Sequence, residues 1–205
     1  MTGPNRVVVA TLRDGLEPGG WYFLRGVPGS GRTHLLTAAF DECRRRSGSA
    51  MFLSLFDERH RGLLDHAEGD WLVVDDVDAV AGHGEGELAL FNALNRWRGA
   101  RSTVIMSGQG REAFELPDLR SRLGQAARLT LEPLDDAGLA ELVRRLASEH
   151  EAALGRGVVE YMLKRAPRNA GRLAEVMKQC VRRAQAERRT ISIPLVREVL
   201  KKCEG

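Results

Sequence analysis

One short segment combines glycines, hydroxyl groups and a cation in an order that suits phosphate binding. Glycines let consecutive backbone N–H groups turn towards phosphate oxygens, and the positive end of a following helix dipole adds to the attraction. The spacing matches the phosphate-loop motif, in which the hydroxyl residue Thr33 binds Mg²⁺. We expect the loop, with His34 at the helix start, to hold ADP or ATP; a glycine-rich turn without ligand is the alternative. The loop consists of Gly26, Val27, Pro28, Gly29, Ser30, Gly31, Arg32 and Thr33.

An arginine stands where the phosphate-loop motif has a lysine. Arg32 keeps the positive charge, so phosphate binding survives the exchange. Its guanidinium is a wide planar fork, whereas lysine is a compact point charge, and the two sit differently against the β and γ phosphates. We therefore expect hydrolysis to suffer more than binding. A general arginine bias is the alternative explanation, since four of the 31 basic residues are lysines.

Two aspartates follow the apolar run Trp71–Val74, which has the composition of a buried strand. Ligands of parallel sheets bind beyond the carboxyl ends of the strands, so these acids are expected beside the phosphate loop. Asp75 is the expected Mg²⁺ ligand, together with Thr33. Asp76 occupies the position at which many ATPases polarise the attacking water. An acid at a strand end is common by itself, and its combination with the loop makes the prediction specific.

Two later segments supply further groups for nucleotide chemistry. Ser107 or Gln109, at the polar end of an apolar strand, could orient water at the γ-phosphate; an ordinary polar turn is the alternative. Arg120 and Arg122 are two positions apart on a short predicted helix, so they point to different faces. One of them is free to reach the nucleotide of a neighbouring subunit. Such a contact is typically worth roughly 10³–10⁵ in rate.

Short apolar runs alternate with segments of helical spacing in the first part of the chain. Strands separated by helices predict a parallel sheet with helices on both faces. After Pro133 only helical stripes follow, and the last of four helices is predicted to start at Ser192 and Pro194. We therefore expect an α/β domain over residues 1–132 and a small all-helical lid over residues 133–205. The expected strands are Trp21–Arg25, Ala50–Leu55, Trp71–Asp75, Ser102–Ser107 and Arg128–Leu131, and the expected helices of the first domain are Thr33–Arg45, Glu87–Arg98 and Asp118–Leu123.

The composition excludes several other classes of protein. No apolar stretch approaches the roughly 20 residues of a membrane helix, and residues 1–5 lack the order of a secretory signal. Cys43, Cys180 and Cys203 are odd in number and scattered, which argues against a disulfide framework and indicates a cytoplasmic protein. Residues 1–139 carry 16 basic and 20 acidic side chains, whereas the rest of the chain carries 15 and 8. The basic end favours anionic partners, with solvated helix faces as the alternative.

Four short motifs stand in order along the chain, namely Gly31–Leu36, Val74–Val77, Leu116–Leu123 and Ile191–Val196. Together they resemble the DnaA-type AAA+ family, and within it the Hda group of regulatory inactivators of DnaA. The resemblance covers nearly the whole chain and implies an AAA+ core, a helical lid and a bound nucleotide, usually ADP. It also implies contact with the initiator DnaA and with the sliding clamp on DNA. Arg122 matches the arginine finger that promotes hydrolysis of the ATP held by DnaA.

The chain departs from the family pattern in several places. The helix-turn-helix domain of DnaA has no counterpart after Lys202, and residues 56–70 are too few for the extra helix that engages single-stranded DNA in DnaA and helicase loaders. The glutamine- and leucine-rich N-terminal peptide that binds the clamp has no counterpart either. In the lid, Gly171 stands at the position of the sensor arginine, which leaves Arg172 or Arg168 as displaced candidates. We therefore expect a regulator rather than a complete initiator or a loader.

A string similar to clamp-binding peptides occurs at Phe52–Phe56. Because it lies on a predicted buried strand, we expect it to pack in the core rather than to dock on the clamp. The sequence therefore does not show how the clamp would be bound, and any contact with DNA is expected to be weak or indirect.

Three hypotheses about function follow from these observations. In the first, the protein is a nucleotide-binding AAA+ negative regulator of replication initiation, hydrolyses nucleotide weakly, and offers Arg122 to ATP bound on DnaA. In the second, it is a self-assembling DnaA-like ATPase whose Arg122 serves its own neighbour in a homo-oligomer. In the third, it is a DNA-binding adaptor or helicase-loader-like protein that uses the basic lid. Arg32 and the displaced lid arginine favour the first hypothesis over the second.

Overall fold

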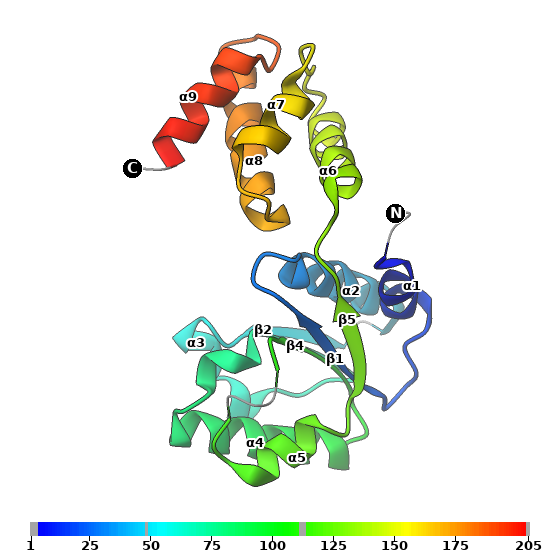
Figure 1. Ribbon diagram of the computed structural model, residues 1–205. Coiled ribbons are helices and arrows are strands. Elements are labelled where there is room, and N and C mark those ends of the chain that lie inside the picture. Colours follow the sequence, from blue (N-terminus) through cyan, green and yellow to red (C-terminus); the bar gives the residue numbers. More distant parts are fainter. Residues whose placement is uncertain (1–3, 48, 111–113, 204–205) are drawn as a thin grey trace. The chain divides into compact units, whose positions relative to one another are not determined.

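The computed structural model describes residues 4–47, 49–110 and 114–203 (Figure 1). The chain divides into two units, residues 1–132 and residues 133–205. The boundary falls at Pro133, where the alternation of strands and helices in the sequence ends.

Five parallel strands form the sheet of the first unit. They are β1 (Trp21–Gly26), β2 (Ala50–Ser54), β3 (Trp71–Asp75), β4 (Thr103–Gly108) and β5 (Ala127–Leu131), in the order β2-β3-β4-β1-β5. The expected α/β fold with a five-stranded parallel sheet is therefore confirmed. The ends of β1, β2, β4 and β5 differ from the expected ones by one residue. Because β4 lies between β1 and β3, the glycine-rich loop and the two aspartates leave the sheet from strands that are second neighbours.

Helices cover both faces of the sheet (Figure 1). On one face lie α1 (Arg6–Asp14) and α2 (Arg32–Ser47), and on the other lie α4 (Gly84–Gly99) and α5 (Pro117–Leu123). Successive residues of a strand point to opposite faces, so neighbours in one strand enter different cores. The core under α1 and α2 includes Leu24, Val73 and Ile105, and the opposite core includes Phe23, Val74 and Met106.

Four elements of the first unit have no counterpart among the expected ones. They are the helices α1 and α3 (Glu58–Arg61) and two 3₁₀ turns, η1 (Leu64–His66) and η2 (Val77–Val80). The turn η2 follows directly after the two aspartates of β3, so it sets the direction in which the chain leaves the sheet edge.

The second unit consists of α6 (Asp136–Glu149), α7 (Val158–Arg165), α8 (Ala170–Ala186) and α9 (Ile193–Cys203). Side chains of Asp135 and Asn169 cap α6 and α8 by accepting N–H groups at 2.8 and 3.0 Å. The apolar stripes of the helices meet in one core, which includes Val143, Met162, Met177, Cys180 and Val196. The all-helical character predicted for this part of the chain is confirmed. None of the described helices is long and apolar enough to cross a membrane.

The string Phe52–Phe56 packs in the core over most of its length. Leu53 and Leu55 are buried, and the ring of Phe52 packs edge-on against Phe40 at 5.7 Å between centroids. The prediction of core packing is wrong for Phe56, which follows the end of β2 and is 78% exposed. Phe56 lies in the turn that follows β2, and this turn carries its side chain out to solvent.

Cys43 is expected to resist alkylation in the folded protein. The residue belongs to α2, its side chain is buried in the core, and burial raises the pKa of its thiol to about 11. At pH 8 about one thiol in a thousand is therefore ionised, and the thiolate is the reactive form. Peptide mapping after treatment with iodoacetamide, with and without denaturant, checks this expectation. Labelling of Cys43 in the native protein at the rate of an exposed cysteine would contradict it.

Candidate nucleotide-binding site

The glycine-rich loop joins a strand to a helix, as the sequence predicts. β1 ends at Gly26 and α2 begins at Arg32. Gly29 and Gly31 have φ angles of 77° and 101°, a region that favours glycine. A Cβ atom at Gly26 would lie 2.5 Å from Oγ of Ser30, so a larger residue would displace the loop. The conformation of the loop therefore depends on glycine at these three positions.

Polar groups of this loop are arranged in a way that suits an anion. Ser30 is buried, and its Oγ has no hydrogen-bond partner within the described part of the chain. Pro28, Thr33 and His34 are exposed around the loop and the first turn of α2. A buried hydroxyl that lacks a partner beside an exposed helix start is the environment that a phosphate group can satisfy.

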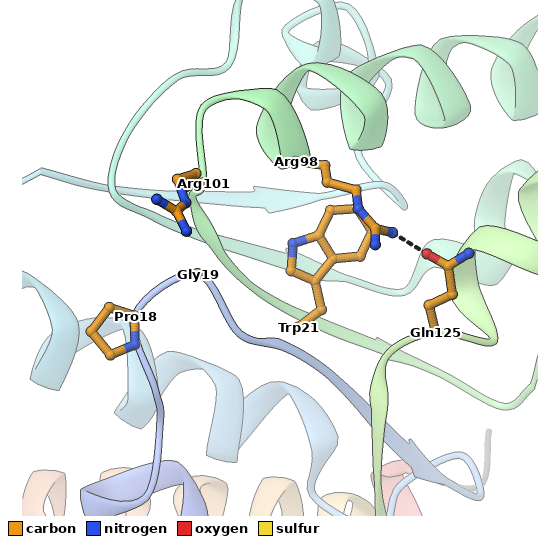
Figure 2. A pocket seen from close by; sticks show the side chains of 6 residues that line it. All are labelled: Pro18, Gly19, Trp21, Arg98, Arg101 and Gln125. Carbon is orange, nitrogen blue, oxygen red and sulfur yellow. Dashed lines mark hydrogen bonds between the residues drawn. The ribbon is translucent and has the colours of Figure 1, made fainter.

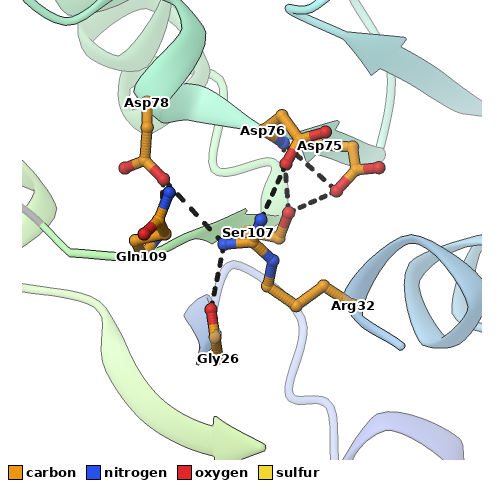
Figure 3. Close-up of polar contacts among 7 residues, drawn as sticks. All are labelled: Gly26, Arg32, Asp75, Asp76, Asp78, Ser107 and Gln109. Atoms are coloured by element: carbon orange, nitrogen blue, oxygen red, sulfur yellow. Dashed lines mark hydrogen bonds and ion pairs between the residues drawn. The ribbon is translucent and has the colours of Figure 1, made fainter. Parts of the chain in front are cut away.

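The guanidinium of Arg32 extends from the loop towards the ends of β3 and β4 (Figure 3). Its Nη2 donates to Oδ1 of Asp76 at 3.0 Å, and its Nη1 donates to the carbonyl oxygen of Gly26 at 3.1 Å. Oδ2 of Asp78 lies 3.9 Å from Nη1. The side chain is only 10% exposed. A phosphate that enters the loop must therefore compete with two carboxylates for this cation.

Asp75 is buried at the end of β3 and is held from β4. Its Oδ1 accepts the hydroxyl of Ser107 and, at 3.1 Å, the N–H of Asp76. Oγ of Ser107 also accepts the N–H of Asp76 at 3.1 Å, so the three groups form a closed set of hydrogen bonds (Figure 3). Of the two alternatives at the polar end of β4, Ser107 thus contacts the acid, whereas the side chain of Gln109 is exposed.

Asp76 has a left-handed backbone conformation, with φ 53° and ψ 52°. Burial raises the pKa of its carboxyl, and the nearby carboxylate of Asp75 adds to this rise. The guanidinium of Arg32 opposes the rise, and Asp78 adds to it again. The ionised form of Asp76 is therefore less favourable in the folded protein than in the unfolded chain.

We expect Asp76→Asn to stabilise the protein at neutral pH. Asparagine tolerates the left-handed conformation and removes a charge that the folded state disfavours. An acid with a raised pKa gives stability that is full below the pKa of the unfolded chain and is lost as the pH rises through the folded pKa. The free energy of unfolding of the variant should therefore rise relative to that of wild type across this range of pH, and the difference should persist at pH 7.

Thermal denaturation of both proteins between pH 3 and pH 8 measures this difference. Each kcal/mol corresponds to about 2–4 °C in the melting temperature for a chain of this size. The melting temperatures should converge at the acid end of the range. Equal values for the two proteins at pH 7 would show that the charge of Asp76 carries no penalty.

Asp78 belongs to the same site, although the sequence analysis does not single it out. Its Oδ2 accepts the backbone N–H of Gln109, and its Oδ1 is buried and has no hydrogen-bond partner among the described residues. A Cβ atom at Gly108 would lie 2.8 Å from this Oδ1, so glycine is needed there. The sequence signal is weak, because an acid three positions beyond the first aspartate is ordinary in a turn.

A magnesium ion at this site would depend on oxygen atoms from outside the protein. Within the described ranges, no group of three or more His, Cys, Asp or Glu side chains is arranged to hold a metal ion by itself. Thr33 and Asp75 are the residues that would hold Mg²⁺, the first exposed and the second buried. Nucleotide sites usually complete the coordination of Mg²⁺ with phosphate oxygens and water, so the residues fit a nucleotide-borne ion.

Arg122 lies near the amino ends of the strands, whereas the loop lies at their carboxyl ends. It stands at the end of α5, and its Nη1 is 3.5 Å from Oε1 of Gln125. Gln125 precedes β5 and lines a pocket with Trp21, the first residue of β1. The loop follows the carboxyl end of β1, whereas Arg122 lies on the side of the amino end of that strand. The structure therefore brings Arg32, Asp75 and Asp76 together but does not bring Arg122 to them.

A buried carboxylate that the sequence analysis missed holds the start of α5. Glu87 is 1% exposed and accepts the N–H groups of Gly82, Glu115 and Leu116 at 2.8, 3.0 and 2.7 Å. Burial alone would raise the pKa of Glu87, but the three N–H donors outweigh it and hold the pKa below its ordinary value. The sequence signal is an acid in the buried stripe of a predicted helix.

The two candidate sensor arginines of the lid differ in their contacts. Arg172 lies in the first turn of α8 and its side chain is exposed. Arg168 precedes that helix and pairs with Asp136 at 2.7 Å. Gly171, at which the family resemblance leads us to expect the sensor arginine, is also exposed. Both arginines remain candidates, and the one without a carboxylate partner among the described residues is Arg172.

Several solved structures share this fold. Domain III of the replication initiation protein DnaA from Thermotoga maritima superposes with a TM-score of 0.79 at 17% identity, over 98% of this chain and 93% of that one. AMPPCP-bound DnaA from Aquifex aeolicus gives 0.72 at 20% identity, over 92% and 66%. The RuvB Holliday junction branch migration motor of Thermotoga maritima gives 0.63 at 18% identity, over 94% and 64%. This chain thus spans about two thirds of the last two.

At these identities the structural similarity defines the fold, an AAA+ core followed by a helical lid. A family model adds a more particular match, because residues 135–200 fit the family described as Hda, lid domain. The lid match and the likeness to DnaA domain III together support a DnaA/Hda-type AAA+ protein.

Proposed function

We propose that this protein is a nucleotide-binding AAA+ regulator of replication initiation that acts on DnaA. It binds ADP or ATP with Mg²⁺ at the glycine-rich loop, hydrolyses nucleotide weakly, and stimulates hydrolysis of the ATP held by DnaA through Arg122. The effect on initiation is negative, because hydrolysis removes the ATP-bound form of the initiator. The protein carries out this role in the cytoplasm.

The position of Arg122 is the observation that carries the proposal. β1 separates the pocket beside Arg122 from the glycine-rich loop, and a strand of six residues is roughly 15–20 Å long. The guanidinium therefore lies far from the loop of its own subunit. A half-buried arginine at the end of a helix, without a carboxylate partner among the described residues, suits a nucleotide on another molecule.

Weak hydrolysis by the protein itself is supported by the contacts of Arg32. Its guanidinium is shared between Asp76, Asp78 and the carbonyl oxygen of Gly26. Asp76, which would polarise the attacking water, is thereby paired with a cation. Binding of a nucleotide remains favourable, since Ser30 and the positive-φ glycines keep the loop open to phosphate. The solved DnaA of Aquifex aeolicus is itself bound to AMPPCP.

The test is hydrolysis of ATP bound in advance to DnaA, in the presence of the sliding clamp on DNA. The reaction is followed with and without this protein, and with and without the clamp. We expect hydrolysis to accelerate when the protein is added. Acceleration that needs the clamp would make the clamp a partner, whereas equal acceleration without it would remove the clamp from the mechanism. No acceleration, under conditions in which a known inactivator works, would contradict the proposal.

The second candidate is a self-assembling ATPase, because Arg122 could serve a second copy of this chain as well as DnaA. In that case turnover by the purified protein alone should rise steeply with its concentration. A third function, DNA binding through the lid, rests on the 15 basic and 8 acidic side chains after residue 139. Affinity for DNA that falls steeply with salt would favour it, since phosphate contacts release counterions.

A further inference from the structure

A second cationic site lies near the amino end of β1, whereas the glycine-rich loop follows the carboxyl end of that strand. A cavity of about 320 Å³ opens there between the start of β1, the end of α4 and the segment after α5 (Figure 2). None of the residues that line it is acidic; they are Pro18, Gly19, Trp21, Arg98, Arg101 and Gln125. The cavity thus presents two guanidinium groups, an indole wall and one amide.

The first guanidinium is fixed in place by its neighbours. Cζ of Arg98 lies 5.8 Å from the centre of the Trp21 ring, within the range of a cation–π contact. Its Nη1 donates to Oε1 of Gln125, the same oxygen that lies 3.5 Å from Arg122. A single neutral oxygen therefore serves two cations, and neither has a carboxylate within 4 Å among the described residues.

The second guanidinium stands on a strained residue. Arg101 follows the end of α4 with a φ angle of 59°, and its N–H donates to the carbonyl oxygen of Arg98 at 3.1 Å. Glycine is the usual residue at this left-handed position after a helix, because a side chain is disfavoured there. Figure 2 shows Arg101 and Gln125 flanking Trp21. An arginine in place of glycine costs stability, and such costs are concentrated at functional sites.

We propose that this cavity binds a phosphate monoester. The planar fork of a guanidinium matches phosphate oxygens, and a phosphate monoester carries about 1.5 to 2 negative charges. That charge balances two guanidinium groups, whereas one carboxylate would not. The volume leaves room for a sugar against the Trp21 ring. The monoester comes either from a free nucleotide or from the 5′ end of a DNA strand, and the site goes beyond the proposed function.

The test follows the indole N–H signal of Trp21 by NMR in the full chain, at constant ionic strength set with sodium chloride. Inorganic phosphate, AMP, and oligothymidine with a 5′-phosphate or a 5′-hydroxyl are titrated in turn. The loop at the other edge also takes nucleotides, but Trp21 reports the cavity. We expect a saturable shift with each phosphate monoester. Tighter binding of the 5′-phosphorylated strand than of AMP identifies the DNA end, and the reverse order identifies the free nucleotide.

Arg101→Gly is the decisive variant, because it removes the cation and relieves the backbone. We expect the affinity for phosphate at Trp21 to fall at least about tenfold while the melting temperature stays at or above that of wild type. Arg188→Gly is the matched control, since Arg188 also has a positive φ, 47°, after the end of α8 and does not line the cavity. It should keep the affinity of wild type.

Arg101→Asn provides a second variant that tolerates the left-handed conformation, and it should weaken phosphate binding to a similar extent. Three results would overturn the proposal. They are the absence of a saturable shift at Trp21, an affinity that Arg101→Gly and Arg101→Asn leave unchanged, and tighter binding of a glutamate-rich peptide than of any phosphate. None of these results would bear on Arg122 and DnaA, because the titrations contain no DnaA.

Discussion

Replacing Arg122 by alanine is expected to abolish the stimulation of hydrolysis on DnaA while leaving the protein folded. An arginine that stabilises the transition state of phosphoryl transfer from a neighbouring molecule is worth roughly 10³–10⁵ in rate. Arg122 is half-buried, and the one hydrogen bond of its side chain among the described residues is the 3.5 Å approach to Gln125. Its loss should therefore change the melting temperature little. The variant should also bind its own nucleotide as wild type does, because the loop is at the other edge of the sheet.

The measurement is single-turnover hydrolysis of ATP bound in advance to DnaA, with wild type, Arg122→Ala and Arg120→Ala. Arg120 is an exposed arginine two positions away on the same helix, so its loss controls for the change in charge. We expect Arg120→Ala to stimulate like wild type. If Arg122→Ala stimulated fully, the protein would still act on DnaA but through another group. Co-sedimentation with DnaA then separates a lost contact from a lost catalytic effect.

The second large effect is expected at Arg32. Arg32→Lys should raise the turnover of ATP by the protein alone by about tenfold or more, with a much smaller change in nucleotide affinity. The arginine contacts Asp76 with Nη2, and it contacts Asp78 and the carbonyl oxygen of Gly26 with Nη1. A lysine carries its three donors on one atom and cannot span them. The charge of the lysine is therefore available to the β and γ phosphates, and the carboxylate of Asp76 is available to the attacking water.

Steady-state hydrolysis and calorimetric titration with ADP, on the same preparations, separate turnover from affinity. Arg45→Lys is a suitable control, since Arg45 is exposed on the same helix and pairs with Glu42. A turnover that Arg32→Lys leaves unchanged would show that the arginine does not limit hydrolysis. The limit would then lie in the lid arginine or in Asp76.

The sequence predicts the sheet and the loop well because both are encoded locally. Apolar runs mark β1 to β4, alternating leucines mark β5, and the glycines at positions 26, 29 and 31 define the turn into α2. The proximity of Asp75 to the loop follows from a general rule about parallel sheets. The same rule says nothing of which acid pairs with Arg32, because that depends on a side chain with four rotatable bonds.

The remaining features depend on tertiary contacts that no local pattern records. Asp78 enters the site because η2 turns it back towards Gln109, and Phe56 leaves the core because it lies in the turn after β2. In the sequence Glu87 is a charge within an apolar stripe; in the structure it accepts one backbone N–H from Gly82, just before its own helix, and two from the distant residues Glu115 and Leu116. In the sequence Arg101 resembles any surface residue, and only its positive φ angle shows that its backbone is strained.

The contacts of Glu87 determine how the helix that carries Arg122 can be controlled. Three N–H donors hold the pKa of Glu87 below its ordinary value, so this carboxylate contributes stability above the pKa of the unfolded chain and loses it only as the pH falls through the folded pKa. No change of pH within a living cell reaches that range. The anchor of α5 is therefore engaged at neutral pH and does not respond to small changes of pH. If Arg122 acts as we propose, the timing of its action comes from the abundance of the protein, from its nucleotide or from its partner.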